Sequence, residues 1–388
     1  MMIKKIFYFE IVLLKTFFIL AGYLLDKYPQ HRYTLLFVYT AVMGVTSTAI
    51  PFSPSLPFFF GLCGVNGFVM GSLDTGGNVL CLDIWQGLDD SGPYMHSIHF
   101  SFGLGAFLAP IIAEKFLRES DIGSTHIGSH ENKEHGENFN LNENTVIESG
   151  PGLKMLYPIL GVYAIIVSIG YLIFAIKGYK NNRENSDPYN KLSQQEKSTS
   201  NNYVVISLIL AFLFLYAGME VMYGTYLATF SVQSELHLSR QMGARITAVF
   251  WGSFAAMRFI AIFISVKLSP LGTLLFSFFM SIVGCTLLAI FAESTVEALG
   301  IFTAFMGIGM APIYASSMLW MDQFMTVTNK IGGLMTVAAG VGADVFPLLL
   351  GQFIATFPML LMYMQVGLIY FCILLFSLAT WVGKQRTR

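Results

Sequence analysis

The sequence is poor in charged residues. Only 12% of its 388 residues are charged, whereas 55% are of hydrophobic type and the mean hydropathy is +0.63. Ordinary soluble domains carry about 25% charged residues, so a soluble protein of this composition would have too little polar surface to stay dispersed. The net charge of −1 also excludes the basic surface that nucleic-acid binding requires.

Motifs of enzymes and metal sites are missing as well. The four cysteines lie inside apolar stretches and have neither disulfide nor metal spacing. No phosphate-binding loop or nucleophile elbow is present. The string HENKEH separates its histidines by one residue too many for the zinc motif HExxH, which places both on one helical face. We therefore expect neither an enzyme nor a bound metal or organic cofactor.

Long apolar runs, in contrast, occur along the whole chain. A bilayer core about 30 Å thick needs roughly 20 apolar residues of helix, and lipid forces the backbone of each span to satisfy itself. We count about eleven runs of this length, at 6–25, 34–52, 57–81, 96–117, 153–176, 203–229, 244–266, 270–291, 298–320, 331–353 and 359–383. They predict an all-α protein that crosses the lipid bilayer many times.

Two polar segments divide these runs. Residues 118–152 and 177–202 lack the apolar content of a packed element and predict loops. With the basic C-terminal tail in the cytoplasm, most loop lysines and arginines fall on the same side. This predicts an N-terminal half at 1–176 with an outer loop at 118–152, a cytoplasmic linker at 177–202 and a C-terminal half at 203–388. The N-terminal lysines then lie outside, and one missing helix before residue 6 would explain both this conflict and the odd number of spans.

A short motif occurs twice. Residues 103–110 and 340–347 both read GxGAxxxP, in the fourth and tenth predicted spans. Small residues at close helical spacing permit tight contacts between membrane helices. Because the two copies are six spans apart, they favour two related six-helix halves.

Three stretches carry a resemblance to a known family. The segment from Gly22 to Arg32 resembles the charged loop between the second and third helices of the major facilitator superfamily, with Lys27 and Pro29 departing from its pattern. The strings GSLDTGGNVLCLDIW and SGPYMHSIHFSFGLGAFLAP, between Gly71 and Pro110, are similar to the fucose–proton symporter group and its animal relatives, the sodium-dependent glucose transporters. LYAGMEVMYGTYL, at 215–227, resembles the seventh helix of that group.

The resemblance implies a bundle of two pseudo-symmetric halves that alternate access to a central cavity, with the first of twelve helices missing here. It also implies a hexose such as glucose as the small-molecule substrate, with Na⁺ or H⁺ as the coupling ion. We expect a monomer in the plasma membrane. Two alternative functions stay open: a receptor or scaffold that binds a solute without moving it, and a truncated inactive form of such a transporter.

Asp74 is the first candidate site residue. An ionised carboxylate in an apolar span costs roughly 2.5 kcal/mol or more at midplane, so such a residue usually faces a cavity or a partner. Asn66, Met70 and Asn78 share its helical face at intervals of four residues. The face offers a carboxylate and two carboxamides, which suit sugar hydroxyls or a hydrated cation, so we expect Asn66 and Asn78 to bind sugar. The resemblance places a coupling carboxylate at the position of Asp74. The alternative is a polar clamp between helices.

Glu220 is the second intramembrane carboxylate. Tyr216 and Tyr223 flank it on one helical face, and tyrosines both stack on sugar rings and donate hydrogen bonds. We expect ion coupling at Glu220 and sugar contacts at both tyrosines; a structural hydrogen bond is the alternative. His99 stands where the resembling group places a sugar-binding amide, and imidazole also donates and accepts; a packing histidine is the alternative.

Three further charges are candidates for gating or structural roles. Asp26 lies in the charged loop motif and can form a latch between helices on the cytoplasmic side. Arg258 and Asp344 lie inside predicted spans. They are interpreted as a buried ion pair or, for Asp344, as a third cavity carboxylate.

Overall fold

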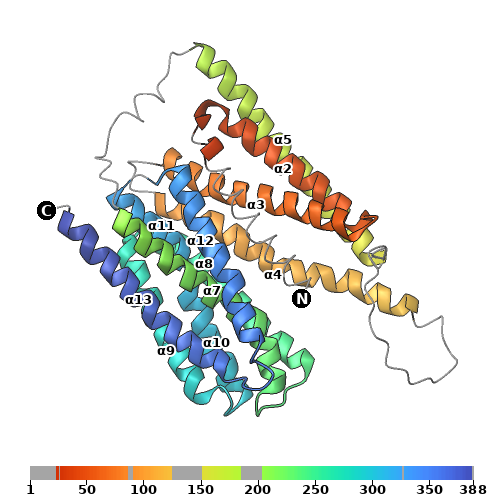
Figure 1. Ribbon diagram of the computed structural model, residues 1–388, viewed down its shortest axis with the longest axis vertical. Coiled ribbons are helices and arrows are strands. Elements are labelled where there is room, and N and C mark those ends of the chain that lie inside the picture. The colour runs from red at the N-terminus through yellow and green to blue at the C-terminus, as the bar shows by residue number, and fades with distance from the viewer. Residues whose placement is uncertain are drawn as a thin grey trace. The chain divides into compact units, whose positions relative to one another are not determined.

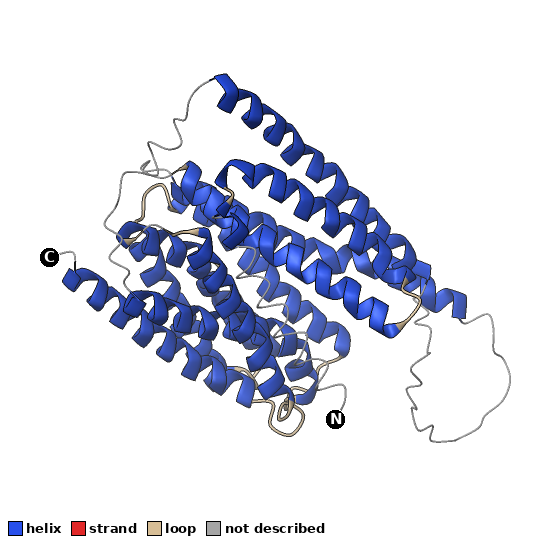
Figure 2. Ribbon diagram, turned by 45° about the horizontal axis from the view of Figure 1, so that its top comes forward, coloured by secondary structure: helices blue, strands red, loops and turns tan. Residues whose placement is uncertain are grey.

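The computed structural model describes residues 23–25, 27–85, 91–124, 151–184, 203–325 and 327–386. Within these ranges all regular structure is helical, and strands are absent (Figures 1 and 2). The all-α prediction is therefore confirmed. Asp26, the first predicted span up to residue 22 and most of the two polar segments lie outside the described residues.

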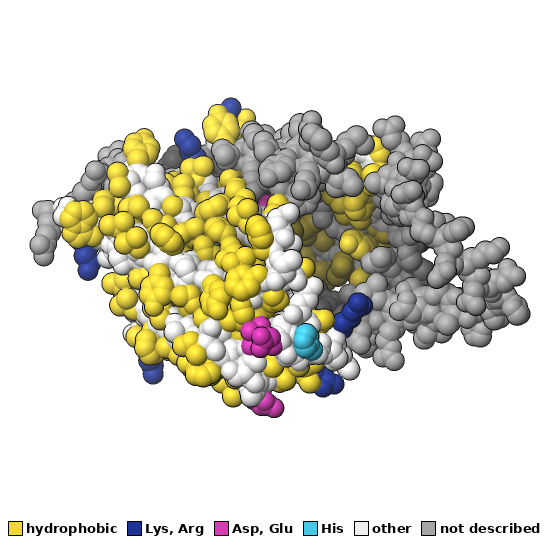
Figure 3. All heavy atoms as spheres, turned by 60° about the horizontal axis from the view of Figure 1, so that its bottom comes forward, with side chains coloured by type: hydrophobic (Ala, Val, Ile, Leu, Met, Phe, Trp, Pro, Cys, Tyr) yellow, Lys and Arg dark blue, Asp and Glu magenta, His cyan; other side chains and the backbone are white. Residues whose placement is uncertain are grey.

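Nine described helices are long and apolar enough to cross a membrane. They match nine of the predicted spans, from Arg32–Phe52 to Leu360–Gln385. The predicted span at 96–117 lies inside α4 (Ser91–Ser124). Figure 3 shows hydrophobic side chains over much of the described surface of one face. The few charged groups in this view lie mostly toward its margin. The chain is an integral, multi-pass membrane protein.

The chain forms two compact units. The first unit comprises residues 1–76 and 108–192, and the second comprises 77–107 and 193–388. Two helices contribute to both units, α3 (Leu56–Ile84) and α4. The division along the chain into halves at 1–176 and 203–388 stays a prediction.

In the first unit, α2 (Arg32–Ala49) and α5 (Pro151–Glu184) lie side by side (Figure 1). The 3-10 helices η1 (Pro29–His31) and η2 (Ile50–Phe52) flank α2. Glycines set the distance between α2 and α5, because a Cβ on Gly44 would lie 2.7 Å from the Gly161 carbonyl oxygen. Small residues thus allow these membrane helices to pack at close range.

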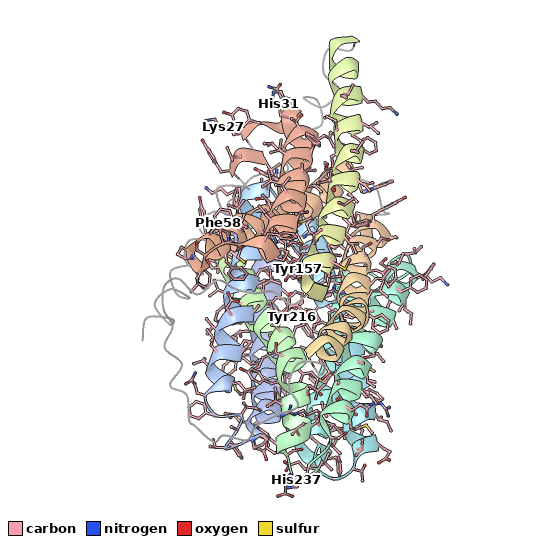
Figure 4. All side chains as sticks on the ribbon, turned by 90° about the vertical axis from the view of Figure 1, so that its right-hand side faces the viewer. Lys27, His31, Phe58, Tyr157, Tyr216 and His237 are labelled. Carbon is pink, nitrogen blue, oxygen red and sulfur yellow. The ribbon has the colours of Figure 1, made fainter. Side chains whose placement is uncertain are left out.

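The second unit is built around α7 (Tyr203–Gln233). Its other complete helices are α8 (Arg240–Ile264), α9 (Pro270–Phe291), α10 (Val296–Met310), α11 (Ile313–Phe324), α12 (Asn329–Gly351) and α13 (Leu360–Arg386). α7 packs against α8, α12 and α13, and its side chains from Phe212 to Phe230 supply much of the buried core. Figure 4 labels Tyr216, about midway along this helix.

Hydroxyl side chains start four of these helices. Ser239, Ser269, Thr295 and Thr328 each accept a hydrogen bond from the backbone N–H three residues further on, at 3.1 to 3.3 Å. Such N-caps satisfy donors that have no partner within the helix. The sequence thereby fixes where α8, α9, α10 and α12 begin.

The span from Val296 to Phe324 is broken in the middle. α10 ends at Met310 and α11 begins at Ile313. Pro312 lies in the gap; it has no N–H to donate and its ring crowds the preceding turn. Backbone carbonyl groups at this break must find other donors, because lipid supplies none.

The repeated motif makes one close contact in each copy. A Cβ on Gly103 would lie 3.3 Å from Arg258 Cδ on α8, and one on Gly342 would overlap the Phe214 carbonyl group on α7. The other glycines, Gly105 and Gly340, face open space. Each copy therefore brings its helix against a neighbour through a single glycine.

We predict that Gly342→Ala lowers the thermal stability of the purified protein in detergent. Overpacking at the α7–α12 contact costs roughly 1–3 kcal/mol. Gly340→Ala is the matched control, since it adds the same methyl group to the same helix without a clash. Equal melting temperatures for the two variants would contradict this account of the contact.

Candidate functional site

Tyr216 links the buried carboxyl group of Glu220 to the break between α10 and α11. Its Oη lies 2.5 Å from Glu220 Oε2 and 2.9 Å from the Met310 carbonyl oxygen. Tyr216 is 1% exposed and Glu220 is 9% exposed. A tyrosine hydroxyl carries one hydrogen, so it donates to one of these two acceptors at a time.

Arg258 contacts the residue next to Met310. Its Nε donates to the Ala311 carbonyl oxygen at 3.3 Å, and its Nη1 donates to the His99 carbonyl oxygen of α4 at 2.9 Å. The guanidinium also lies 4.3 Å from the centre of the Phe254 ring, a cation–π contact. Arg258 thus ties α4, α8 and the end of α10 together, one residue along from the carbonyl group that Tyr216 contacts.

The break therefore receives side-chain donors from two helices. Tyr216 of α7 donates a hydrogen bond to the Met310 carbonyl oxygen, and Arg258 of α8 donates one to the carbonyl oxygen of Ala311, the next residue. Both carbonyl groups lie at the C-terminal end of α10, where helix carbonyls lack intrahelical partners. Glu220, Tyr216, Arg258 and these two carbonyl groups are called the hinge network below.

Two histidines of α4 adjoin this network. The His99 ring lies against Tyr314 of α11, with ring centres 5.1 Å apart. His96 Nε2 is 3.4 Å from the Ser316 hydroxyl. Both histidines are buried, and neither His96 Nδ1 nor His99 Nε2 has a hydrogen-bond partner among the described residues. Each ring thus carries one buried nitrogen without a hydrogen-bond partner in this conformation.

Tyr223 and Gln365 make structural contacts on other sides of α7. The Tyr223 hydroxyl is 2.8 Å from Thr303 Oγ1 of α10, and the tyrosine is fully buried. Gln365 Nε2 of α13 donates to the Met219 carbonyl oxygen at 3.0 Å. In this conformation Tyr223 binds a neighbouring helix, and its predicted contact with sugar stays a prediction.

The residues of the predicted polar face of α3 differ in how exposed they are. Met70 and Asp74 are exposed, whereas Asn78 is buried. The Asn66 carboxamide oxygen accepts hydrogen bonds from Thr46 at 2.9 Å and Ser47 at 3.3 Å, both on α2. Asn66 therefore serves as a clamp between helices here. An exposed carboxylate on an apolar span needs water or a polar group beside it, which keeps Asp74 a candidate for coupling.

Arg258 and Asp344 are the two remaining charged candidates that the structure describes. Asp344 is half-buried on α12, and the direct hydrogen-bond partners of Arg258 are the His99 and Ala311 carbonyl groups. The ion pair between Arg258 and Asp344, one of the two interpretations offered for them, stays a prediction. Within those same residues, no group of three His, Cys, Asp or Glu side chains is arranged to hold a metal ion.

Sequence reasoning found Glu220, Tyr216 and Arg258 but missed what joins them. The missing partners are the Met310 and Ala311 carbonyl groups, which carry no side-chain signal. Pro312, which sits within an otherwise apolar run, is the signal that points to them.

A family model described as Major Facilitator Superfamily matches residues 12–347. Sodium-dependent glucose transporter 1 of Xenopus laevis is 30% identical over 350 residues, which are 88% of this chain and 66% of that protein. The Homo sapiens protein of the same name is 27% identical over 353 residues, 90% of this chain and 66% of the human protein. This chain thus spans slightly less than two thirds of the length of these relatives.

Solved structures show the same fold. The crystal structure of the major facilitator superfamily transporter FucP in the outward conformation has a TM-score of 0.64 and 16% sequence identity, and the match covers 98% of this chain and 89% of FucP. A second crystal structure, of a variant of the Escherichia coli fucose:proton symporter FucP, has a TM-score of 0.57 at 16% identity and covers 97% of this chain and 91% of that one. At this identity the likeness shows the fold alone.

Replacing Arg258 tests the hinge network. We expect Arg258→Leu to lower the melting temperature of the detergent-solubilised protein, because two buried carbonyl groups lose their side-chain donor, at roughly 1–3 kcal/mol each. Arg245→Leu is the control, since Arg245 is exposed on the same helix. Equal stability of the two variants would show that Arg258 does not hold the break.

Proposed function

Because the chain belongs to the major facilitator superfamily, we propose that it is a secondary active transporter that moves a hexose such as glucose together with Na⁺ or H⁺. The observation that carries this proposal is the hinge network, in which a buried carboxyl group meets a broken membrane span. Broken spans that expose backbone carbonyl groups near buried polar side chains are typical of transporter binding sites.

The relatives support the class of substrate. Those from Xenopus laevis and Homo sapiens are named for sodium-dependent glucose transport, and FucP is described as a fucose:proton symporter. All three names combine a sugar with a cation. The names differ in the ion, so the proposed function leaves Na⁺ and H⁺ both open.

We assign the roles as follows. Asp74 and Glu220 couple the ion, since they are carboxylates within apolar spans. Asn78 and His99 contact the sugar, because amides and imidazoles offer both donors and acceptors to hydroxyl groups. The sugar and the ion each stabilise the same occluded conformation and thereby raise each other's affinity. Rocking of two related halves then alternates access to the site.

The orientation in the membrane, the host membrane and the oligomeric state are proposed as well. The excess of basic residues on one side of the predicted spans favours a cytoplasmic C-terminus. We propose a monomer in the plasma membrane that needs no organic cofactor.

Uptake of labelled glucose tests the proposal. Cells expressing the chain are assayed in sodium and in choline buffer, each at neutral and at mildly acidic pH, with surface expression confirmed. Accumulation that depends on sodium or on pH is expected. Saturable binding without uptake or counterflow would instead indicate a receptor, and neither binding nor uptake would remove glucose as the substrate.

Asp74→Asn separates coupling from binding. The variant is expected to lose concentrative uptake while keeping sugar counterflow, because the amide retains hydrogen bonding but cannot change charge with the ion. Glu297→Gln, at an exposed glutamate in the first turn of α10, is the control and should accumulate sugar normally. Full accumulation of sugar by Asp74→Asn would contradict the assignment of ion coupling to Asp74.

A further inference from the structure

We infer that Glu220 and Tyr216 form a proton-binding site, not a sodium site, and that the bound proton decides whether Tyr216 clamps the break between α10 and α11. This inference rests on the proposed function, because it names the ion and the site through which the transport is coupled. It is carried by the number of hydrogens available at the hinge network and by the buried contacts around it.

The hydrogen bonds do not balance when Glu220 is ionised. Tyr216 Oη has acceptors at 2.5 Å and 2.9 Å but only one hydrogen. If Glu220 is ionised, that hydrogen goes to the carboxylate and the Met310 carbonyl group loses this donor. A protonated Glu220 supplies the second hydrogen: its O–H donates to Tyr216 Oη, and the Tyr216 O–H donates to Met310. Both contacts are satisfied only in the protonated form.

Burial of Glu220 also favours its protonated form. Glu220 is 9% exposed and makes no direct ion pair with the described cations. Arg258, the cation of the hinge network, makes its hydrogen bonds to the Ala311 and His99 carbonyl groups. An ionised carboxylate at this depth without a hydrogen-bonded cation is costly. Proton binding neutralises the group and requires no further ligand.

A sodium ion fits this site poorly. Hard cations bind through sets of oxygen atoms that direct lone pairs at the metal. Here the oxygens next to the carboxyl group, Tyr216 Oη and Met310 O, already share a hydrogen. Arg258 is hydrogen-bonded to the residue next to Met310, and its positive charge would repel a fixed cation there.

The groups that act on Glu220 come from two helices. Tyr216 faces it from α7 itself, and Arg258 faces it from α8. The contacts from α10 and α13 in this region are made by the Met310 carbonyl group and by the amide of Gln365. The helices α12 and α13, which also pack against α7, carry the titratable groups Asp344, half-buried on α12, and Cys372, buried on α13 with its Sγ 4.0 Å from the Phe212 carbonyl oxygen.

Proton exchange thereby switches the hinge. The proton arrives from water and bonds to a Glu220 oxygen, and the same proton returns to water when the site is deprotonated. With the proton bound, Tyr216 and Arg258 hold the adjacent Met310 and Ala311 carbonyl groups. Without it, Arg258 alone still holds the end of α10, and Met310 is freer to move relative to α7. The proton thus shifts the population between a clamped and a released break.

Infrared difference spectroscopy of the full chain in lipid nanodiscs tests the proton site directly. A protonated carboxylic C=O band is expected in sodium-free buffer at neutral or mildly acidic pH. The band should be lost in Glu220→Gln and shifted in Tyr216→Phe, which removes its hydrogen-bond partner. It should be unchanged in Glu297→Gln, at an exposed glutamate, and in Tyr226→Phe, at a second tyrosine of α7.

Two outcomes would overturn the inference. One is a carboxylic band that Glu220→Gln leaves intact, which would mean that Glu220 is ionised. The other is loss of the Glu220 band on adding sodium at constant pH, which would make the site a sodium site. Glu220→Gln is expected to fold, since its amide N–H donates to Tyr216 Oη as the protonated acid does.

The transport readout uses the same variants. Glu220→Gln should keep sugar counterflow but lose pH-dependent accumulation, because its break stays clamped at every pH; accumulation that follows pH as in the wild type would contradict the switch. The infrared result does not require transport. A Glu220 band in a chain that moves no sugar would refute the proposed function alone, and sugar accumulation without the band would refute the proton site alone.

Discussion

The hydrogen bonding of two backbone carbonyl groups in the middle of a membrane span is the constraint on which the second unit depends. Pro312 breaks the helix, and the Met310 and Ala311 carbonyl groups then need donors where lipid offers none. Tyr216 and Arg258 supply them from α7 and α8. These two side chains are buried among the aromatic and aliphatic groups that surround α7, so packing fixes them while the hydrogen bonds set their orientation.

Close helix contacts place the donors. Gly103 lets α4 approach Arg258, and Gly342 lets α12 approach α7. A Cβ on Gly342 would overlap a backbone carbonyl group of α7, and one on Gly103 would crowd the Arg258 side chain. Because Arg258 holds both the Ala311 and the His99 carbonyl groups, a shift of the end of α10 would be transmitted to α4. The hinge network thus places a buried polar site and the break in the membrane span in the same group of atoms. Coupling of a solute to an ion requires that the two bias the same conformational equilibrium.

Much of this could be predicted from the sequence. The length and composition of the apolar runs identify the spans, because a membrane imposes one element length and one way to satisfy the backbone. Glu220, Tyr216 and Arg258 stand out as polar groups in apolar runs. Their connection could not be predicted, because the sequence does not show which backbone carbonyl groups a side chain reaches across helices. For the same reason Asn66, expected at a sugar site, is found bonded to Thr46 and Ser47.

The most direct measurement is sugar-driven proton movement through the purified chain in sodium-free liposomes, followed with a pH-sensitive dye in the lumen. Glucose added outside should acidify the lumen, since sugar moving down its gradient would carry protons through Glu220 and Tyr216. Glucose uptake into the same liposomes without any change in luminal pH would contradict the central claim that a proton at this carboxyl group is coupled to the movement of sugar.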